Sequence, residues 1–195
     1  NPTPIGIFTN TKHKQDKQKL LNYTKAKASR TGSNGVKHFY NNHCMLTAHS
    51  DLHGLKSWLI DCALKFSTQV LGYKVSDLFV AGSWLNLTQN GGFQPKHLHE
   101  NSLVSGTYYV QRNDDHAPII FYNGAELTTP PHPILTPPKK ETPYNSHSLV
   151  NPKEGDLLLW SSELLHGYPS SNAGRVSLSI NFLPTAIDTL YGFKL

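Results

Sequence analysis

The hydrophobic positions of the chain change their period near residue 75. Before that point, apolar side chains from Leu55 to Val70 recur at steps of three and four, which is the spacing of a helix with one buried face. Ser50 or Asp51 is expected to cap the start of this helix, and Gly72 follows its end. The pattern therefore predicts an amphipathic helix that packs its apolar stripe against a sheet.

A second, more polar helix is predicted upstream, at residues 11–28. Its few apolar positions include Leu20, Leu21 and Ala28, and a turn-forming run, SRTGSNG at residues 29–35, follows it. This helix has only a narrow apolar face to bury.

From residue 79 onward the period is two. Short runs rich in β-branched and aromatic residues are separated by Gly, Pro and Asn, and they lie at residues 79–87, 102–110, 118–122, 156–160 and 175–182. Helices come first and strands follow, without regular βα alternation. This order predicts a mainly β fold with flanking helices, an antiparallel sandwich or jelly roll that carries its helices on one outer face.

The length of 195 residues suits one domain with a substantial core. We expect residues 1–195 to form a single domain, in which residues 1–75 are mainly helical support and residues 76–195 form the β core. Residues 129–143, TPPHPILTPPKKETP, are too rich in proline for central strands. We interpret them as a surface loop that shields a pocket.

The composition excludes several classes of protein. A hydrophobic content of 37% with 16% charged residues is typical of a globular chain. No apolar run approaches the roughly eighteen residues of a membrane span. Cys44 and Cys62 are too few for a disulfide framework, and their spacing matches no zinc motif. We expect a protein of the reducing cytoplasm.

The net charge of +5 originates in residues 12–30, where basic side chains outnumber the single acid, Asp16. A nucleic-acid surface usually interleaves aromatic residues with the basic ones, and this segment has only Tyr23. A solvated helix face is the favoured interpretation, and weak contact with nucleic acid is the alternative.

Candidate chemistry begins with two histidines, His97 and His99, just before the second strand run. In an extended strand, residues two apart point to the same face, about 6–7 Å apart. Two imidazoles placed in this way can bind one metal ion. The pair alone is a weak signal, because sheet-rim histidines are common.

A third segment adds His166 after a strand run and Arg175 nine residues later. Alternation places Ser177 on the face of Arg175, while the intervening residues are apolar. Burying an unpaired guanidinium is costly, and a carboxylate ligand would offset that cost. Arg binds a carboxylate through two hydrogen bonds, and a serine hydroxyl can add a third.

Together these segments resemble the Fe(II)/2-oxoglutarate-dependent oxygenases. The pattern runs from SWLNL through HLHENSLVSGTYYV to GDLLLWSSELLHGYPSSNAGRVSLSINF, over about residues 80–183, and is similar to a subgroup of oxygenases from marine bacteria and their phages. The resemblance implies a double-stranded β-helix, the cupin-like form of the jelly roll. It also implies Fe(II), 2-oxoglutarate and O₂ as cofactor and co-substrates, and hydroxylation of a substrate C–H with release of succinate and CO₂.

The resemblance also implies roles for individual residues. Three histidines, His97, His99 and His166, match the metal ligands. Arg175 and Ser177 match the residues that hold the distal carboxylate of 2-oxoglutarate, and Asn86 and Tyr109 match further positions of the co-substrate site.

One position departs from the usual family pattern, because most members have Asp or Glu where His99 stands. Glu100 is the alternative second ligand if the strand ends or bulges at Leu98.

Two other classes compete with an oxygenase. A cupin-like metal-binding protein or isomerase would have histidine pairs but would not need Arg175 with Ser177, and a structural jelly roll would need no metal. We expect a small-molecule or peptide substrate and no membrane or nucleic-acid partner, in a bacterium or a phage-infected host cell. A homodimer is one open assembly state.

Overall fold

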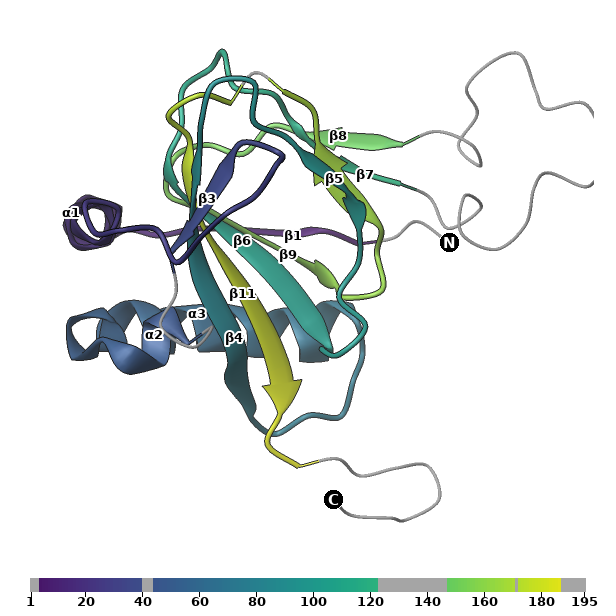
Figure 1. Cartoon of the computed structure of the whole chain (residues 1–195). Helices are drawn as coiled ribbons and strands as arrows, with labels where there is room; N and C mark the ends of the chain where they lie inside the picture. Colours follow the sequence, from purple (N-terminus) through teal and green to yellow (C-terminus); the bar gives the residue numbers. More distant parts are fainter. Residues whose placement is uncertain (1–3, 40–43, 123–146, 171, 187–195) are drawn as a thin grey trace, which may run out of the picture.

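Two antiparallel sheets face each other in the protein, with helices on the outer side of the larger sheet (Figure 1). The computed structural model describes residues 4–39, 44–122, 147–170 and 172–186. The predicted fold class, a jelly roll with flanking helices, is confirmed. The arrangement leaves a space between the sheets that is lined mainly by the inward faces of their strands.

The larger sheet has the strand order β1-β9-β6-β11-β4-β3-β2. Its strands are β1 (Gly6–Thr9), β2 (Arg30–Thr31), β3 (Val36–Phe39), β4 (Leu78–Thr88), β6 (Val104–Gln111), β9 (Asp156–Ser161) and β11 (Val176–Pro184). The smaller sheet has the order β5-β10-β7-β8. Its strands are β5 (Gln94–His97), β7 (Ile119–Phe121), β8 (Ser148–Val150) and β10 (His166–Tyr168).

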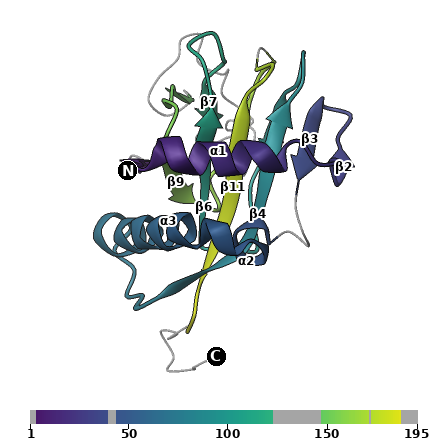
Figure 2. The same ribbon diagram turned by 90° about the vertical axis from the view of Figure 1, so that its left-hand side faces the viewer.

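Helices α1 (His13–Tyr23) and α3 (His53–Lys65) lie across the outer face of the larger sheet (Figure 2). Short α2 (Met45–Ala48) precedes the turn η1 (Ser50–Leu52), and η2 (Phe66–Val70) continues α3 as one π-helical stretch. The main hydrophobic core fills the space between these helices and the sheet, with Leu59, Phe66 and Leu178 fully buried in it. The predicted packing of an apolar helix stripe on a sheet is therefore confirmed.

Strand β11 shows how period-two alternation divides the chain between the two faces of the sheet. Val176, Leu178 and Ile180 belong to the core under the helices. Ser177 and Ser179 point the other way and line a cavity between the sheets. The larger sheet thus provides both the wall of the core and the wall of the cavity.

The helix ends differ from those predicted. The first helix ends at Tyr23 rather than near residue 28. Ser50 and Asp51 cap nothing by their side chains, because they begin the 3₁₀ turn η1, and the N-cap position of α3 is Leu52. Gly72 does follow the second helix, with φ 76°, a conformation that glycine adopts without strain.

Two features of the N-terminal region lay outside the prediction. Strand β1 pairs with β9, and the run after the first helix contains β2, which forms a hairpin with β3. Both elements are short edge strands, whose pairing is decided by the neighbours they meet rather than by their own pattern.

A polar network ties α1 to the sheet. The hydroxyl of Tyr108 lies 2.7 Å from Nδ1 of His13 and accepts a hydrogen bond of 3.0 Å from the Asn10 amide. The same amide donates to Asp16, and Lys17 contacts Glu154 at 2.7 Å. Because these groups form hydrogen bonds with one another, a largely polar helix can cover a buried tyrosine.

Other expectations concern single segments. The proposed pocket loop, residues 129–143, lies outside the described residues. Cys44 and Cys62 are free thiols. Within the described ranges, none of the helices combines the length and the apolar character of a membrane-spanning segment.

Candidate metal centre and co-substrate cavity

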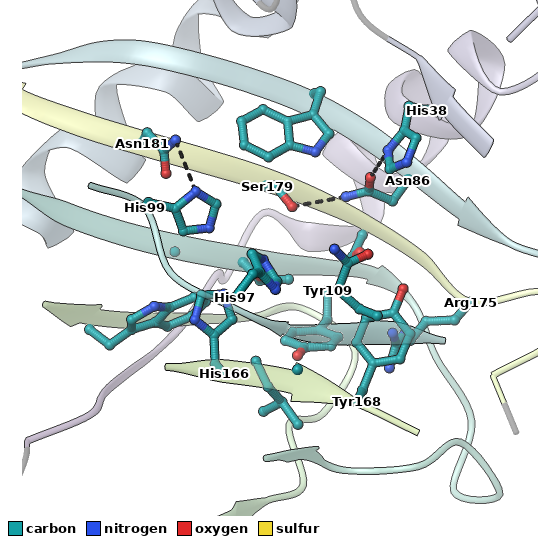
Figure 3. Close-up of a pocket in the computed structure, with 18 residues that line it drawn as sticks. His38, Asn86, His97, His99, Tyr109, His166, Tyr168, Arg175, Ser179 and Asn181 are labelled. Atoms are coloured by element: carbon teal, nitrogen blue, oxygen red, sulfur yellow. Dashed lines mark hydrogen bonds between the residues drawn. The ribbon is translucent and has the colours of Figure 1, made fainter. Parts of the chain in front are cut away.

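Three histidines meet between the sheets. His97 is the last residue of β5, His166 is the first of β10, and the two are paired across these neighbouring strands. His99 lies two residues beyond β5, where its backbone N–H donates to the Ser162 carbonyl at 2.9 Å. One nitrogen from each ring lies within 4.8 Å of the others, so these side chains could hold one metal ion (Figure 3).

Two of the rings have a defined tautomer. Nδ1 of His97 lies 2.9 Å from the Pro95 carbonyl oxygen, and Nδ1 of His166 lies 2.8 Å from that of Leu164. A carbonyl oxygen only accepts, so each Nδ1 carries a hydrogen and the Nε2 lone pair is free. Backbone carbonyls commonly orient metal-binding histidines in this way.

His99 is supported by a chain of polar side chains. The amide of Asn181 lies 3.5 Å from its Nδ1, and Ser105 donates to the Asn181 oxygen at 2.9 Å. Ser105 also contacts Ser162, whose carbonyl accepts from the His99 backbone. These contacts hold the His99 ring on its Nδ1 side, which is the side opposite the other two histidines.

Electrostatics keep the three rings neutral. Burial lowers the pKa of His166 to about 3 and that of His99 to about 4. The second cause is repulsion by the positive charge that His97 carries when it is protonated. Burial also lowers the pKa of His97. At neutral pH each ring is therefore uncharged, as metal ligation requires.

The alternative ligand Glu100 does not join this group. It is exposed, in the turn that follows His99. The premise that His97 and His99 share one strand was wrong, because β5 ends at His97. Both rings nevertheless enter the cavity, and their centroids are 5.1 Å apart.

Arg175 marks the other end of the cavity (Figure 3). Its side chain is only 2% exposed, and it lies directly before β11 rather than in it. The guanidinium stacks on the Tyr168 ring at 3.7 Å, and Nη1 donates to Asn172 at 2.7 Å. Its buried Nε has no hydrogen-bond partner among the described residues. Ser177, also buried, lines the same cavity.

The two further predicted residues also line this cavity. The Asn86 oxygen lies 2.7 Å from Nδ1 of His38, and its amide donates to Ser179 at 2.9 Å. Tyr109 is buried, which raises its pKa to about 12 and keeps its hydroxyl protonated. His38 was missed from the sequence, because it reaches the site only through the pairing of β3 with β4.

The cavity has two parts. The inner part has a volume of about 70 Å³ and runs from the three histidines to Arg175. The outer part, of about 660 Å³, shares five lining residues with it: His38, Trp84, Gln94, His97 and His99. An outer volume of this size suits a small-molecule or peptide ligand.

A jelly roll with a three-histidine cluster between its sheets belongs, by fold and site, to the class of double-stranded β-helix metalloproteins. Residues 82–182 match a family described as "Putative 2OG-Fe(II) oxygenase". The chain therefore belongs to the 2OG-Fe(II) oxygenases, and the expectation of a dioxygenase that uses Fe(II), 2-oxoglutarate and O₂ is confirmed at the level of this family.

Solved structures share the fold at low sequence identity. A prolyl-4-hydroxylase from Pseudomonas putida is 12% identical, with 93% of each chain covered and a TM-score of 0.64. A prolyl hydroxylase from Trichoplax adhaerens, solved with a hypoxia inducible factor peptide, is 13% identical, with 94% of this chain and 85% of that chain covered and a TM-score of 0.66.

HygX from Streptomyces hygroscopicus, solved with nickel and 2-oxoglutarate, is also 13% identical, with 94% of this chain and 84% of that chain covered and a TM-score of 0.63. A comparison with curated proteins finds no match.

The residues present fit the groups that the family uses. Three neutral imidazoles suit a divalent transition metal and leave coordination positions open. The buried, incompletely paired guanidinium of Arg175 suits a carboxylate. One end of the cavity is therefore compatible with a metal ion and the other with a carboxylate group.

Proposed function

We propose that His97, His99 and His166 hold the iron of a 2-oxoglutarate-dependent hydroxylase. The observation that carries this proposal is the convergence of three neutral imidazoles at one end of a cavity whose other end is a buried guanidinium. When bound, iron with 2-oxoglutarate and O₂ supplies the oxidation of a substrate C–H, with release of succinate and CO₂. The protein positions the reactants and excludes water.

Arg175 and Ser177 are the residues for the distal carboxylate of 2-oxoglutarate. The guanidinium supplies charge and donors, and the Ser177 hydroxyl lines the same wall. Tyr109 keeps its proton and can donate to the same carboxylate. Asn86 already contacts His38 and Ser179, so its first role is to shape this wall. Its remaining hydrogen-bonding capacity is available to 2-oxoglutarate.

The outer cavity is the entrance for the substrate. It reaches His97 and His99, and its lining includes the half-exposed Phe93, together with Pro95 and Arg30. Apolar and polar groups side by side suit a small molecule or a peptide. Proteins of the same fold include a prolyl hydroxylase solved with a peptide and HygX solved with hygromycin B. The fold therefore supports both a peptide and a small molecule as the substrate class.

Binding of the co-substrate provides the test. Trp84 and Trp160 line the inner cavity, so 2-oxoglutarate should change tryptophan fluorescence only when iron(II) is bound. A cupin-like isomerase would respond to metal alone, and a structural jelly roll would respond to neither. A response to 2-oxoglutarate that does not depend on metal would contradict the proposed function.

Three broader expectations accompany this function. The run of motifs from residue 80 to 183 favours the subgroup found in marine bacteria and phages. The two free thiols, Cys44 and Cys62, suit a reducing cytoplasm. Residues 1–195 remain predicted as one domain, and its assembly state can be measured by light scattering.

A further inference from the structure

The guanidinium of Arg175 is held by a neutral side chain. Asn172 is completely buried, and its oxygen accepts from Nη1 of Arg175 at 2.7 Å. Its amide nitrogen donates to the Pro169 carbonyl at 2.7 Å. Each partner allows only one polarity, so the orientation of the Asn172 amide is fixed. The backbone N–H of Arg175 also donates to the Asn172 carbonyl, which closes a tight turn before β11.

No carboxylate neutralises Arg175 within the described residues. The two ion pairs found there both use Glu154, with His13 and Lys17 as partners. A buried guanidinium is usually paired with an acid, because an uncompensated buried charge is costly. Here its protein partners are an amide oxygen and the face of the Tyr168 ring.

A chain of hydrogen bonds anchors the turn before β11 to Arg112. Arg112 hydrogen-bonds the His116 carbonyl, and His116 donates through Nε2 to the Ala173 carbonyl beside Asn172. Burial, and then the charges of Arg175 and Arg112, lower the pKa of His116. Asp115 opposes these charges at His116, and of the two arginines only Arg175 lines the cavity. The charge that faces the ligand is therefore that of Arg175 itself.

We propose that Asn172 is a positioning residue for 2-oxoglutarate, and that its neutrality leaves the charge of Arg175 available to the distal carboxylate. This inference rests on the proposed function. An aspartate in the same place would hold the guanidinium equally close but would neutralise it before the ligand arrived. An alanine would release the guanidinium while leaving its charge intact.

The two substitutions therefore separate position from charge. If Asn172 only positions Arg175, Asn172→Asp should bind 2-oxoglutarate better than Asn172→Ala. If neutrality matters, Asn172→Asp should bind it more weakly than Asn172→Ala, by about tenfold or more, because an internal acid competes with the ligand for Arg175.

The experiment measures affinity by anaerobic calorimetry on the Fe(II)-loaded protein. Each variant is titrated with 2-oxoglutarate and with 2-oxopentanoate, which has the same 2-oxo acid end and no distal carboxylate. The wild type should prefer 2-oxoglutarate, and this preference should fall most in Asn172→Asp. Affinity for 2-oxopentanoate should stay similar in both variants.

A matched control is Asn151→Asp. Asn151 also accepts from an arginine, Arg112, at 3.3 Å, but it is exposed and does not line the cavity. This variant should keep the wild-type preference. Metal affinity, measured at the other end of the cavity, reports whether each variant is folded.

The outcomes are distinguishable. If wild type and Arg175→Met bind 2-oxoglutarate equally, the proposed co-substrate site fails and this inference fails with it. If Arg175→Met weakens binding but Asn172→Asp retains at least the affinity of Asn172→Ala, only the inference on charge is overturned. Should Asn172→Asp not fold, unchanged 2-oxoglutarate affinity in Asn172→Ala would overturn the positioning role.

Discussion

Gly167 lies directly against the backbone of Pro95. A Cβ atom on Gly167 would stand 3.0 Å from the Pro95 carbonyl oxygen and 2.7 Å from that of Gln94. The same Pro95 oxygen orients the ring of His97, and Gly167 follows His166 in β10. The close approach of β10 to β5, and with it the meeting of two histidines, thus depends on the absence of one side chain.

Gly167→Ala should therefore weaken metal binding as well as stability. Backbone carbonyls cannot give way as a flexible side chain can, so we expect the free energy of unfolding to fall by about 1–3 kcal/mol. Metal affinity, measured by calorimetry, should fall with it. Gly54→Ala is the control, because a Cβ there meets no atom within 4 Å and Gly54 lies in α3. Equal metal affinities in the two variants would show that the close contact is not needed.

His99 and Glu100 can be separated by mutation. His99→Ala should lower iron affinity by more than about a hundredfold, because it removes one of the three proposed ligands. Glu100→Ala should leave iron affinity unchanged, since this side chain is exposed in the turn. Anaerobic titration with Fe(II) checks both variants. A large loss in Glu100→Ala would move the second ligand to that residue.

Arg175→Met should raise the dissociation constant of 2-oxoglutarate about a hundredfold, which corresponds to ~2–4 kcal/mol for a charge-assisted bidentate contact. Iron affinity should stay close to that of the wild type, because the guanidinium lies at the other end of the cavity. Arg175→Lys should restore only part of the affinity, since an ammonium group lacks the planar fork. Full rescue by lysine would indicate that charge alone is recognised.

Tyr108→Phe tests the network under α1. Losing the hydroxyl leaves the buried Asn10 amide and His13 with one partner fewer, so the free energy of unfolding should fall by about 1–3 kcal/mol in urea denaturation. Tyr23→Phe removes an exposed hydroxyl that contacts Asp51, and its effect should stay below about 0.5 kcal/mol. Similar losses in both variants would mean that the network contributes nothing beyond surface contacts.

The metal-free protein should lose stability as the pH falls below about 6.5. The pKa of His166 is about 3 and that of His99 about 4 in the folded chain, whereas unfolded histidines titrate near 6.5. The unfolded state therefore takes up protons first, and the stability present above pH 6.5 is lost progressively toward pH 3–4.

Denaturation of metal-free protein at several pH values checks this expectation. His166→Gln should make the pH dependence shallower, because one depressed pKa is removed. His53→Gln changes an exposed histidine of α3 and should leave the slope as it is. A wild-type stability that does not change between pH 7 and pH 4 would contradict the prediction.

The strands of the core, and most of the residues that line the cavity, could be predicted from the sequence. Period-two alternation is a local property, so it correctly divided Arg175 and Ser177 from Val176 and Leu178. His97 and His99 meet although β5 ends at His97, because the His99 N–H donates to the Ser162 carbonyl and holds the chain beside the cavity. The three histidines come together, but for a reason different from shared strand alternation.

Other parts of the site could not be found in this way. His38 reaches the site through cross-strand register, and Asn172 through a turn that folds back on Arg175. Such neighbours depend on which strands pair, and pairing is decided by the whole fold. Polar residues without spacing are therefore the ones that sequence patterns overlook.

The two sheets that form the walls of the cavity differ in the length of their strands, and therefore in how many hydrogen bonds hold each sheet together. Strands β4, β11 and β6 have 11, 9 and 8 residues, whereas β5 has 4 and β10, β7 and β8 have 3 each. Arg175 adjoins the long-stranded wall, and His97 and His166 lie on the short-stranded one. Iron bound by His97 and His166 would link β5 to β10 and so stabilise the smaller sheet, to a degree set by the iron concentration. In a cell starved of iron, the backbone amides of β5 and β10 should exchange with solvent first, so the lifetime of the protein would follow the metal supply.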